Sequence, residues 1–510
     1  MATQSIAEPF FLSRARRLTW TRIFSFPVFL AVLLVAGGYV RARMNPPDPD
    51  TWWHIAVGEQ ILAQRGFPIA DTFSFTAAGT PWIAYEWLGE VAMAAASRAG
   101  GMEARAALLF FLSCLFLVLL YYLAHLRSGN PKSAFLACVV LLPLAGLFFT
   151  LRPQLMGFLL LLITLIFLER FRLGRQRQLW ILPAVFLVWV NTHGSFAFGL
   201  FVFGLYFLGG LAKFRWEGVV AEPWSPEQRR HLELVFLLCL VALTATPYGT
   251  QAAAYPVEMA LYQSVNIASI QEWQPLGTAL LAGKIVVAVL ALFFLLNHLV
   301  RPTYRLEELG LLLFAVYSAT LHRRFILLLI LVLAPMLATL LAKWVPPYRA
   351  NKDKPVLNVL LTGVIAVVLV AFFPTKDELA VVVARNYPIH AVEYLRQNPI
   401  PGRMLNEYGW GGYLIWQTAG GHKVFIDGRA DIYDYSGVLT DYMNLTHLKP
   451  GSLRVLEEYA VRACLLRKAD PLATVMAALP DWRSVYEDDL SIIFVRRDAA
   501  RNPLPGQNPT

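Results

Sequence analysis

The sequence predicts a polytopic α-helical membrane protein of about eleven transmembrane helices, followed by a small α/β domain. Of the 510 residues, 57% are hydrophobic and only 15% are charged. In a soluble domain about a quarter of the residues are charged. Apolar runs of near-spanning length recur through most of the chain. After about residue 374 the composition becomes that of a soluble protein, which indicates a separate C-terminal unit.

Hydropathy places the predicted membrane spans in order along the chain. They lie near 22–40, 104–125, 132–150, 153–171, 179–193, 194–213, 232–247, 278–300, 306–322, 323–343 and 355–373. The fifth and seventh runs are short, so either could be a tilted or re-entrant segment. The junctions at 193/194 and 322/323 are tight.

Charges between the spans predict the orientation. Arg14, Arg16, Arg17 and Arg22 precede the first apolar run, which is typical of an uncleaved signal anchor with a cytoplasmic N-terminus. The loops 127–132, 170–177, 213–230, 301–305 and 343–354 are all basic, and they fall on the same side. We therefore expect the C-terminal domain on the outer face. The net charge of +10 has its origin in these loops and does not indicate nucleic-acid binding.

The remaining polar residues at span ends fall on the opposite, outer side. They are Asp48, Asp50, Glu86, Glu90, Arg152, Asn191, His193, Glu258, Glu272, His322, Arg323 and Arg324. Ionisable groups at a membrane edge are costly unless they face water, a partner or a substrate. Their convergence predicts a functional site on the outer face. The four cysteines form no CxxC pair and indicate neither a disulfide framework nor a zinc site.

The first outer loop, residues 41–103, carries two amphipathic patterns. Apolar residues recur at helical spacing over 51–64 and over 82–96, so we expect two helices lying in the membrane interface. These helices would bring Asp48, Asp50 and Glu86 together. Simpler roles stay open: Asp50 could cap the first helix, Asp48 could form an Asp-Pro turn, and Glu86 could be solvated.

Several motifs in this loop and beyond it resemble a known superfamily. They are Asp48-Pro49-Asp50, Trp53-His54-Ile55, Gly79-Thr80-Pro81-Trp82, Tyr85-Glu86-Trp87-Leu88, Asn406-Glu407-Tyr408-Gly409-Trp410 and Phe425-Ile426-Asp427-Gly428-Arg429-Ala430-Asp431. The sequence resembles the GT-C membrane glycosyltransferases, which use polyprenyl-phosphate-linked sugars. It is most similar to an uncharacterised bacterial branch related to the aminoarabinose and protein O-mannosyl transferases.

The resemblance implies a function and a set of roles. A sugar would pass from a polyprenyl-phosphate donor to a hydroxyl of a glycan, lipid or protein acceptor at the outer face of a bacterial inner membrane. Asp50 or Asp48 would be the base, with Asp50 favoured and Glu86 assisting. Arg152, Arg323 and Arg324 would hold the donor phosphate, although snorkelling to the interface is an alternative for the arginines. Substrate contacts would come from His54, Asn191, His193, Glu272 and His322. Asp48, Asp50 and Glu86 could also bind a divalent cation such as Mg²⁺, Mn²⁺ or Zn²⁺.

The resemblance and the composition together divide the chain into a GT-C-like transmembrane domain over 1–374, an extracytoplasmic α/β domain over 375–500, and a disordered tail over 501–510. In the second unit, strands are expected near 403–405, 423–427, 461–466, 482–487 and 491–496. Helices are expected near 388–398, 436–445, 451–459 and 470–479. Asp427 and Asp431 would end a strand, either as part of a site or in a turn stabilised by Asp427 and Arg429.

Two other functions compete with the enzyme. The chain could be a non-catalytic subunit or scaffold of a cell-surface polysaccharide assembly, in which the carboxylates of the first outer loop would be dispensable. A transporter is less favoured, because the sequence shows neither mid-membrane charges nor internal repeats.

Overall fold

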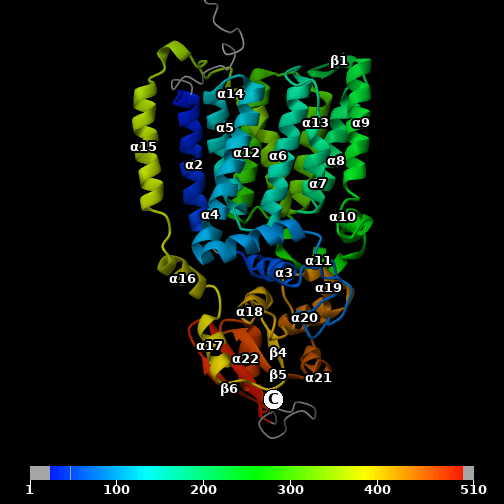
Figure 1. Cartoon of the computed structure of the whole chain (residues 1–510), viewed down its shortest axis with the longest axis vertical. Coiled ribbons are helices and arrows are strands. Elements are labelled where there is room, and N and C mark those ends of the chain that lie inside the picture. The colour runs from blue at the N-terminus through cyan, green and yellow to red at the C-terminus, as the bar shows by residue number, and fades with distance from the viewer. Residues whose placement is uncertain (1–22, 46, 498–510) are drawn as a thin grey trace, which may run out of the picture.

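The computed structural model describes residues 23–45 and 47–497. The arginines predicted to form the basic N-terminal region and the predicted disordered tail lie outside these residues. Figure 1 shows two layers: a bundle of long, roughly parallel helices, and a smaller domain of strands and short helices at one end of it. The elements between the layers come from the first outer loop.

Each predicted span coincides with a helix. These helices are α2 (Phe26–Met44), α4 (Trp87–Ser128), α5 (Pro131–Ala145), α6 (Pro153–Arg172), α7 (Ile181–Val190), α8 (Phe196–Gly209), α9 (Pro226–Ala242), α12 (Leu281–Val300), α13 (Leu306–Leu321), α14 (Ile326–Leu341) and α15 (Pro355–Ala371). Within the described residues, only six helices are long and apolar enough to cross a membrane. A seventh counts if the pair α15 and α16 (Lys376–Ala384), bent by 58°, is one span.

The expected count of eleven full spans is therefore not confirmed, and helix length is the reason. An α-helix rises about 1.5 Å per residue, and the hydrocarbon core is about 30 Å thick. With 10 and 14 residues, α7 and α8 are too short to cross alone. They are separated by the turn at 191–195, where the fifth and sixth spans were expected to meet.

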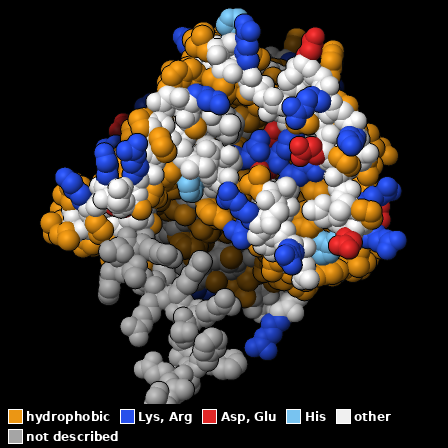
Figure 2. Space-filling model, turned by 90° about the horizontal axis from the view of Figure 1, so that it is seen from above, with side chains coloured by type: hydrophobic (Ala, Val, Ile, Leu, Met, Phe, Trp, Pro, Cys, Tyr) orange, Lys and Arg blue, Asp and Glu red, His pale blue; other side chains and the backbone are white. Residues whose placement is uncertain are grey.

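The basic loops lie together at the end of the bundle away from the smaller domain. A small sheet joins two of them through β1 (Phe214–Trp216), β2 (Val219–Ala221) and β3 (Tyr304–Arg305), in that order. Arg172 Nη2 donates to the carbonyl of Glu222 at 2.9 Å. Figure 2 looks onto this end and shows Lys and Arg side chains spread over it. This grouping is what the positive-inside pattern predicted.

The first outer loop forms two helices, and their ends differ from expectation. Helix α3 (Asp50–Gln64) matches the first pattern. The second begins only at Trp87, because residues 82–84 are irregular and 85–86 form a turn, and it continues as α4 into the bundle. A break separates its surface part from its spanning part at Gly100 and Gly101, where Gly101 takes a φ of 58° that favours glycine.

Helix α3 does not rest on open membrane surface. It packs against α4 on one side and against α18 (Gly411–Gln417) of the C-terminal region on the other. Trp52 and Trp53 are 3% and 7% exposed. The helix was predicted correctly, but its apolar Trp52 contacts Tyr387, Tyr413 and Trp416 of the C-terminal region, and α3 lies between the bundle and that region in Figure 1.

The C-terminal region contains a four-stranded mixed sheet with short helices around it. Its strands are β4 (Arg403–Asn406), β5 (Val461–Arg467), β6 (Trp482–Glu487) and β7 (Ser491–Arg496), in the order β4-β5-β7-β6. The helices are α17 (Ile389–Gln397), α18, α19 (Ala430–Tyr435), α20 (Val438–Thr446), α21 (Val455–Glu458) and α22 (Pro471–Ala478). Within this sheet, β4 and β5 pair in parallel and the other two pairs are antiparallel.

The strand expected at 423–427 was wrong. This segment makes an isolated bridge between Val424 and Ser74 of the first outer loop. The amide of Phe425 donates instead to the side-chain oxygen of Asn406 at 2.8 Å. Its apolar residues are buried as the pattern required, but the backbone partners come from a distant loop and a side chain. Asp427 and Asp431 therefore do not end a strand of the sheet.

Candidate functional site

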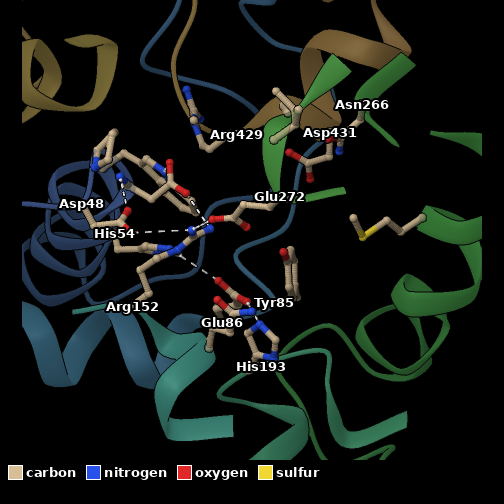
Figure 3. A pocket seen from close by; sticks show the side chains of 18 of the residues that line it. Asp48, His54, Tyr85, Glu86, Arg152, His193, Asn266, Glu272, Arg429 and Asp431 are labelled. Carbon is tan, nitrogen blue, oxygen red and sulfur yellow. Dashed lines mark hydrogen bonds and ion pairs between the residues drawn. The ribbon is translucent and has the colours of Figure 1, made fainter. Parts of the chain in front are cut away.

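A polar cavity of about 230 Å³ lies between the bundle and the C-terminal region. Its walls come from the start of α3, the turn before α4, the start of α6, the segment of α10 (Thr250–Tyr262) and α11 (Ser264–Ser269), and residues 408–409 and 428–431. In Figure 3, Arg152 lies between Asp48 and Glu272, with Glu86 and His193 on one side and Asp431 and Asn266 opposite.

Arg152 is the central cation of this cavity. It precedes α6, and its guanidinium lies 2.6 Å from Asp50 Oδ2 and 3.7 Å from Asp48 Oδ2, and it also pairs with Glu272. Burial lowers the pKa of Arg152, but Asp50, Glu272 and Asp48 outweigh burial and hold it well above the usual range. Arg152 is thus permanently charged and fixes the positions of three carboxylates.

The two aspartates have different contacts. Asp50 accepts a hydrogen bond from Trp53 Nε1 at 3.1 Å, while Asp48 accepts one from the backbone amide of Asp50 at 3.0 Å. Asp50 does not cap α3, because its side chain makes no hydrogen bond to the first amides of the helix. Burial raises the pKa of Asp50 to about 7, against the opposing effect of Arg152. Burial likewise raises the pKa of Asp48.

Glu86 lies between two histidines. Its carboxylate oxygens are 3.7 Å from His54 Nε2 and 3.4 Å from His193 Nε2. His54 Nδ1 lies 3.1 Å from Glu90 Oε1. Burial raises the pKa of Glu86 to about 8 and lowers the pKa of both histidines well below 6.5. At neutral pH these side chains are therefore uncharged neighbours rather than ion pairs, and His54 and Glu90 are joined by a hydrogen bond.

Arg324 is a second cation that lines the cavity. Its guanidinium lies 4.0 Å from the ring centre of Trp273. Across the described residues, no carboxylate lies within ion-pairing distance of Arg324. Arg324 also lines an adjoining, mainly apolar cavity of about 370 Å³ whose walls include Phe158, Phe198 and Phe325. A guanidinium that forms no ion pair and lies beside an apolar cavity can hold the phosphate of a lipid.

The C-terminal wall is held by a buried ion network. Arg429 donates to Asp427 at 2.9 and 2.7 Å and to Asp71 of the first outer loop at 2.7 Å. The alternative of a turn stabilised by Asp427 and Arg429 is therefore correct. Tyr433 Oη also donates to Asp427, at 2.6 Å. This network holds in position the segment 427–431, in which Asp431 lines the cavity.

Asp431 forms part of the wall opposite Arg152. It accepts a hydrogen bond from Tyr255 Oη at 3.2 Å, and burial raises its pKa. Tyr255 stacks on Tyr85, with ring centres 3.7 Å apart. The three side chains make a surface with both an aromatic face and a hydrogen-bonding edge, as suits a sugar or another polyol.

The structure brings together most of the residues predicted for the site. Asp48, Asp50, His54, Glu86, Arg152, His193, Glu272 and Arg324 all line the polar cavity. Arg152 is engaged by carboxylates, whereas Arg324 forms no ion pair among the described residues. His322 lines only the adjoining apolar cavity.

Two predicted residues lie outside the cavities. Arg323 borders neither of them, and its backbone amide donates to the carbonyl of Gln274. The side chain of Asn191 accepts from Trp87 Nε1 at 2.7 Å and donates to the carbonyls of Leu187 and Ala245. Asn191 therefore fastens the start of α4 to α7, which is a structural role.

The predicted metal ligands do not fit a divalent cation in this arrangement. Arg152 occupies the place between Asp48 and Asp50 where a cation would bind, and Glu86 points at the two histidines. No group of three or more His, Cys, Asp or Glu side chains within 23–45 and 47–497 is spaced to hold a metal ion. Arg152 supplies the positive charge that these carboxylates need.

Several residues of the cavity were not predicted. Tyr255 and Asn266 are uncharged and stand in no motif of the sequence, while Tyr85 and Tyr408 stand in two of the motifs but were given no role. Arg429 and Asp431 stand in a motif that drew attention, yet only the fold shows that it reaches the cavity. The signal that could have found Arg429 and Asp431 is the cluster of charged residues at 427–431, directly after the apolar residues 424–426.

No protein-family model matches the sequence, and no curated protein matches it. Solved structures do match. The chain is 13% identical to ArnT from Cupriavidus metallidurans bound to undecaprenyl phosphate, over 92% of this chain and 97% of that one, with a TM-score of 0.52. The apo state of ArnT gives 15% identity over 92% and 97%, with a TM-score of 0.50. The oligosaccharyltransferase of Archaeoglobus fulgidus gives 14% over 87% and 70%, with a TM-score of 0.48.

Proposed function

We propose that this chain, whose fold is that of the GT-C membrane glycosyltransferases, transfers a sugar from a polyprenyl-phosphate donor to an acceptor hydroxyl. The observation that supports this most strongly is that one cavity holds the carboxylates Asp48 and Asp50 together with a cation, Arg324, that forms no ion pair among the described residues. A base and a phosphate site are the two groups that such a transfer needs.

The donor would bind on the Arg324 side. Its phosphate would pair with the guanidinium, and its apolar chain would enter the adjoining cavity of about 370 Å³. The sugar would then lie in the polar cavity, against Tyr85, Tyr255 and Asp431. ArnT has been solved with undecaprenyl phosphate bound, which agrees with a donor of this class.

Asp50 would act as the base. With a pKa of about 7 it is half ionised near neutral pH, which suits a proton acceptor. It would take the proton of the acceptor hydroxyl while that oxygen attacks the anomeric carbon. The bond between this carbon and the phosphate oxygen would break, and its electron pair would leave with the phosphate, where Arg324 stabilises the charge. Arg152 would keep Asp50 in position.

The proposed orientation follows the charges of the loops. The basic end of the bundle would face the cytoplasm, and the cavity and the C-terminal region would face the periplasm or exterior of a bacterial inner membrane. The sugar would therefore be transferred on the outer face.

A scaffold without catalysis is the second candidate. It is favoured by the engagement of Asp48, Asp50 and Glu272 with Arg152, since such a network could hold the loop without reacting.

The test is transfer of label in membranes that contain the full chain. Radiolabelled polyprenyl-phosphate hexoses and pentoses are supplied, and incorporation is compared for the wild type, Asp50→Asn and the exposed control Asp481→Asn. The enzyme predicts incorporation that Asp50→Asn reduces by about 10²–10⁴-fold, the usual contribution of a general base, while Asp481→Asn keeps it. Incorporation no higher than in membranes without the chain would leave the scaffold as the better description, and equal incorporation with Asp50→Asn would assign the base to another group.

A further inference from the structure

A second large cavity lies beside the polar one, on the side away from Arg324. Its volume is about 570 Å³, and it is bounded by the end of α2, the start of α3, the spanning part of α4 and α16. The lining is mainly apolar, with Trp52, Leu109, Phe110, Phe149 and Leu151 among its members. Asp48 lines both cavities, so the two meet at the carboxylates.

Arg105 is a buried cation in the wall of this apolar cavity. It is only 7% exposed. Its guanidinium lies 4.9 Å from the ring centre of Trp52 and 5.0 Å from that of Trp416. Its Nη1 atom has no hydrogen-bond partner. No carboxylate lies within ion-pairing distance of it in the part of the chain that the structure describes.

The other charges around this cavity do not neutralise Arg105. Arg43 pairs with Glu378 at 3.1 Å. Asp48 pairs with Arg152, and Asp377 is exposed at the rim. Glu103, two residues away on α4, acts on Arg105 electrostatically, but no ion pair joins them in the described structure. A buried cation without an ion-paired carboxylate is costly, and stacking on two tryptophans offsets only part of that cost. An anionic ligand would complete the site.

We infer that this cavity binds the acceptor, and that the acceptor is an anionic lipid. Its phosphate or other anionic group would pair with Arg105, its chains would pack in the apolar cavity, and its hydroxyl-bearing headgroup would reach Asp48 and Asp50. This inference rests on the proposed function and adds the class of the acceptor. Donor and acceptor would enter from opposite sides of the carboxylates, one held by Arg324 and the other by Arg105.

Lipid binding to the full chain in detergent, measured by native mass spectrometry, tests this inference. The probes are dioleoyl phosphatidylglycerol, its zwitterionic phosphatidylcholine counterpart and undecaprenyl phosphate. The variants are Arg105→Gln, Arg105→Lys and Ala106→Trp, where the last fills the cavity and leaves the charge in place. Arg98→Gln, an exposed arginine of the same helix, is the matched control.

We expect Arg105→Gln and Ala106→Trp to lower phosphatidylglycerol binding at least fivefold, while Arg105→Lys and Arg98→Gln retain it within twofold. Phosphatidylcholine binding should be weak throughout, and undecaprenyl phosphate binding should be unchanged by these variants. Unchanged phosphatidylglycerol binding in both Arg105→Gln and Ala106→Trp would overturn the inference. A selective loss of undecaprenyl phosphate would also overturn it, since the cavity would then hold the donor. Should Arg105→Gln fail to fold, Ala106→Trp decides.

These binding results are separable from the test of the proposed function. Arg324→Gln should abolish undecaprenyl phosphate binding and leave phosphatidylglycerol bound. If Arg324→Gln retains undecaprenyl phosphate while Arg105→Gln loses phosphatidylglycerol, the donor site is wrong and the anionic lipid site stands.

Discussion

Gly428 of the C-terminal region lies directly against the carboxylate of Asp50. A Cβ atom at Gly428 would overlap Asp50 Oδ1 and would stand 2.6 Å from Trp53 Nε1, the atom that donates to Asp50. The C-terminal region therefore forms the surface against which Asp50 is positioned.

Gly428→Ala should reduce transfer at least tenfold, because the added methyl group displaces Asp50 from Arg152 and Trp53. Initial rates of label transfer measure the effect. Gly277→Ala is the control, since a Cβ there meets no atom within 4 Å, and it should keep the wild-type rate. If both variants transfer equally well, the fit between Gly428 and Asp50 has no bearing on catalysis.

The rate of transfer should rise with pH through about 7, as the Asp50 carboxyl loses its proton. Glu272 raises the pKa of Asp50 and Arg152 lowers it. Glu272→Gln should therefore move the rising limb of the pH–rate profile to lower pH, and Arg152→Gln should move it to higher pH. Profiles of both variants between pH 5 and 9, about the range over which these groups titrate, provide the measurement. A limb that neither change moves would assign the base to another group.

Stability should also depend on pH through Glu86. Burial raises its pKa from 4.5 to about 8 in the folded protein, so the folded state binds the proton more tightly than the unfolded state does. This contribution is present below the unfolded pKa and is lost as pH rises through about 8. Thermal unfolding of Glu86→Gln should show a weaker decline with pH over this window than the wild type. Parallel curves would mean that Glu86 does not titrate there.

Arg429→Gln should lower the free energy of unfolding by about 3–5 kcal/mol, because it leaves Asp71 and Asp427 buried without their cation. Arg454→Gln removes an exposed pair with Glu458 and should cost at most about 1 kcal/mol. Chemical unfolding of the two variants, followed by tryptophan fluorescence, compares these values. A small loss in Arg429→Gln would show that the two carboxylates find water or other donors.

The sequence was a good guide where the signal is local. Apolar runs located the helices of the bundle, and the period of 51–64 predicted α3 almost to the residue. Length was the weak point: hydropathy placed the junction between α7 and α8 at the 191–195 turn, but did not show that the two helices have only 10 and 14 residues. The pattern at 423–427 predicted correctly that these residues are buried, but it was wrong in predicting a strand of the sheet. The backbone of this segment forms its hydrogen bonds with the Asn406 side chain and the first outer loop instead.

The site was predictable only in part for the same reason. Charged residues at span ends stand out in an apolar sequence, and Asp50, Glu86, Arg152 and Arg324 do meet. Their pairing does not follow from the sequence. That Arg152 is held by three carboxylates while Arg324 stays open depends on side-chain directions at the ends of separate helices.

The ion pair between Arg429 and Asp71 joins residues 358 positions apart. Asp71 lies in the first loop to be made, and Arg429 belongs to the last quarter of the chain. During synthesis, Asp71 cannot form this ion pair until residue 429 has been made. The cavity is thus a late product of biogenesis, and a chain truncated before residue 429 would insert its helices without ever assembling a site.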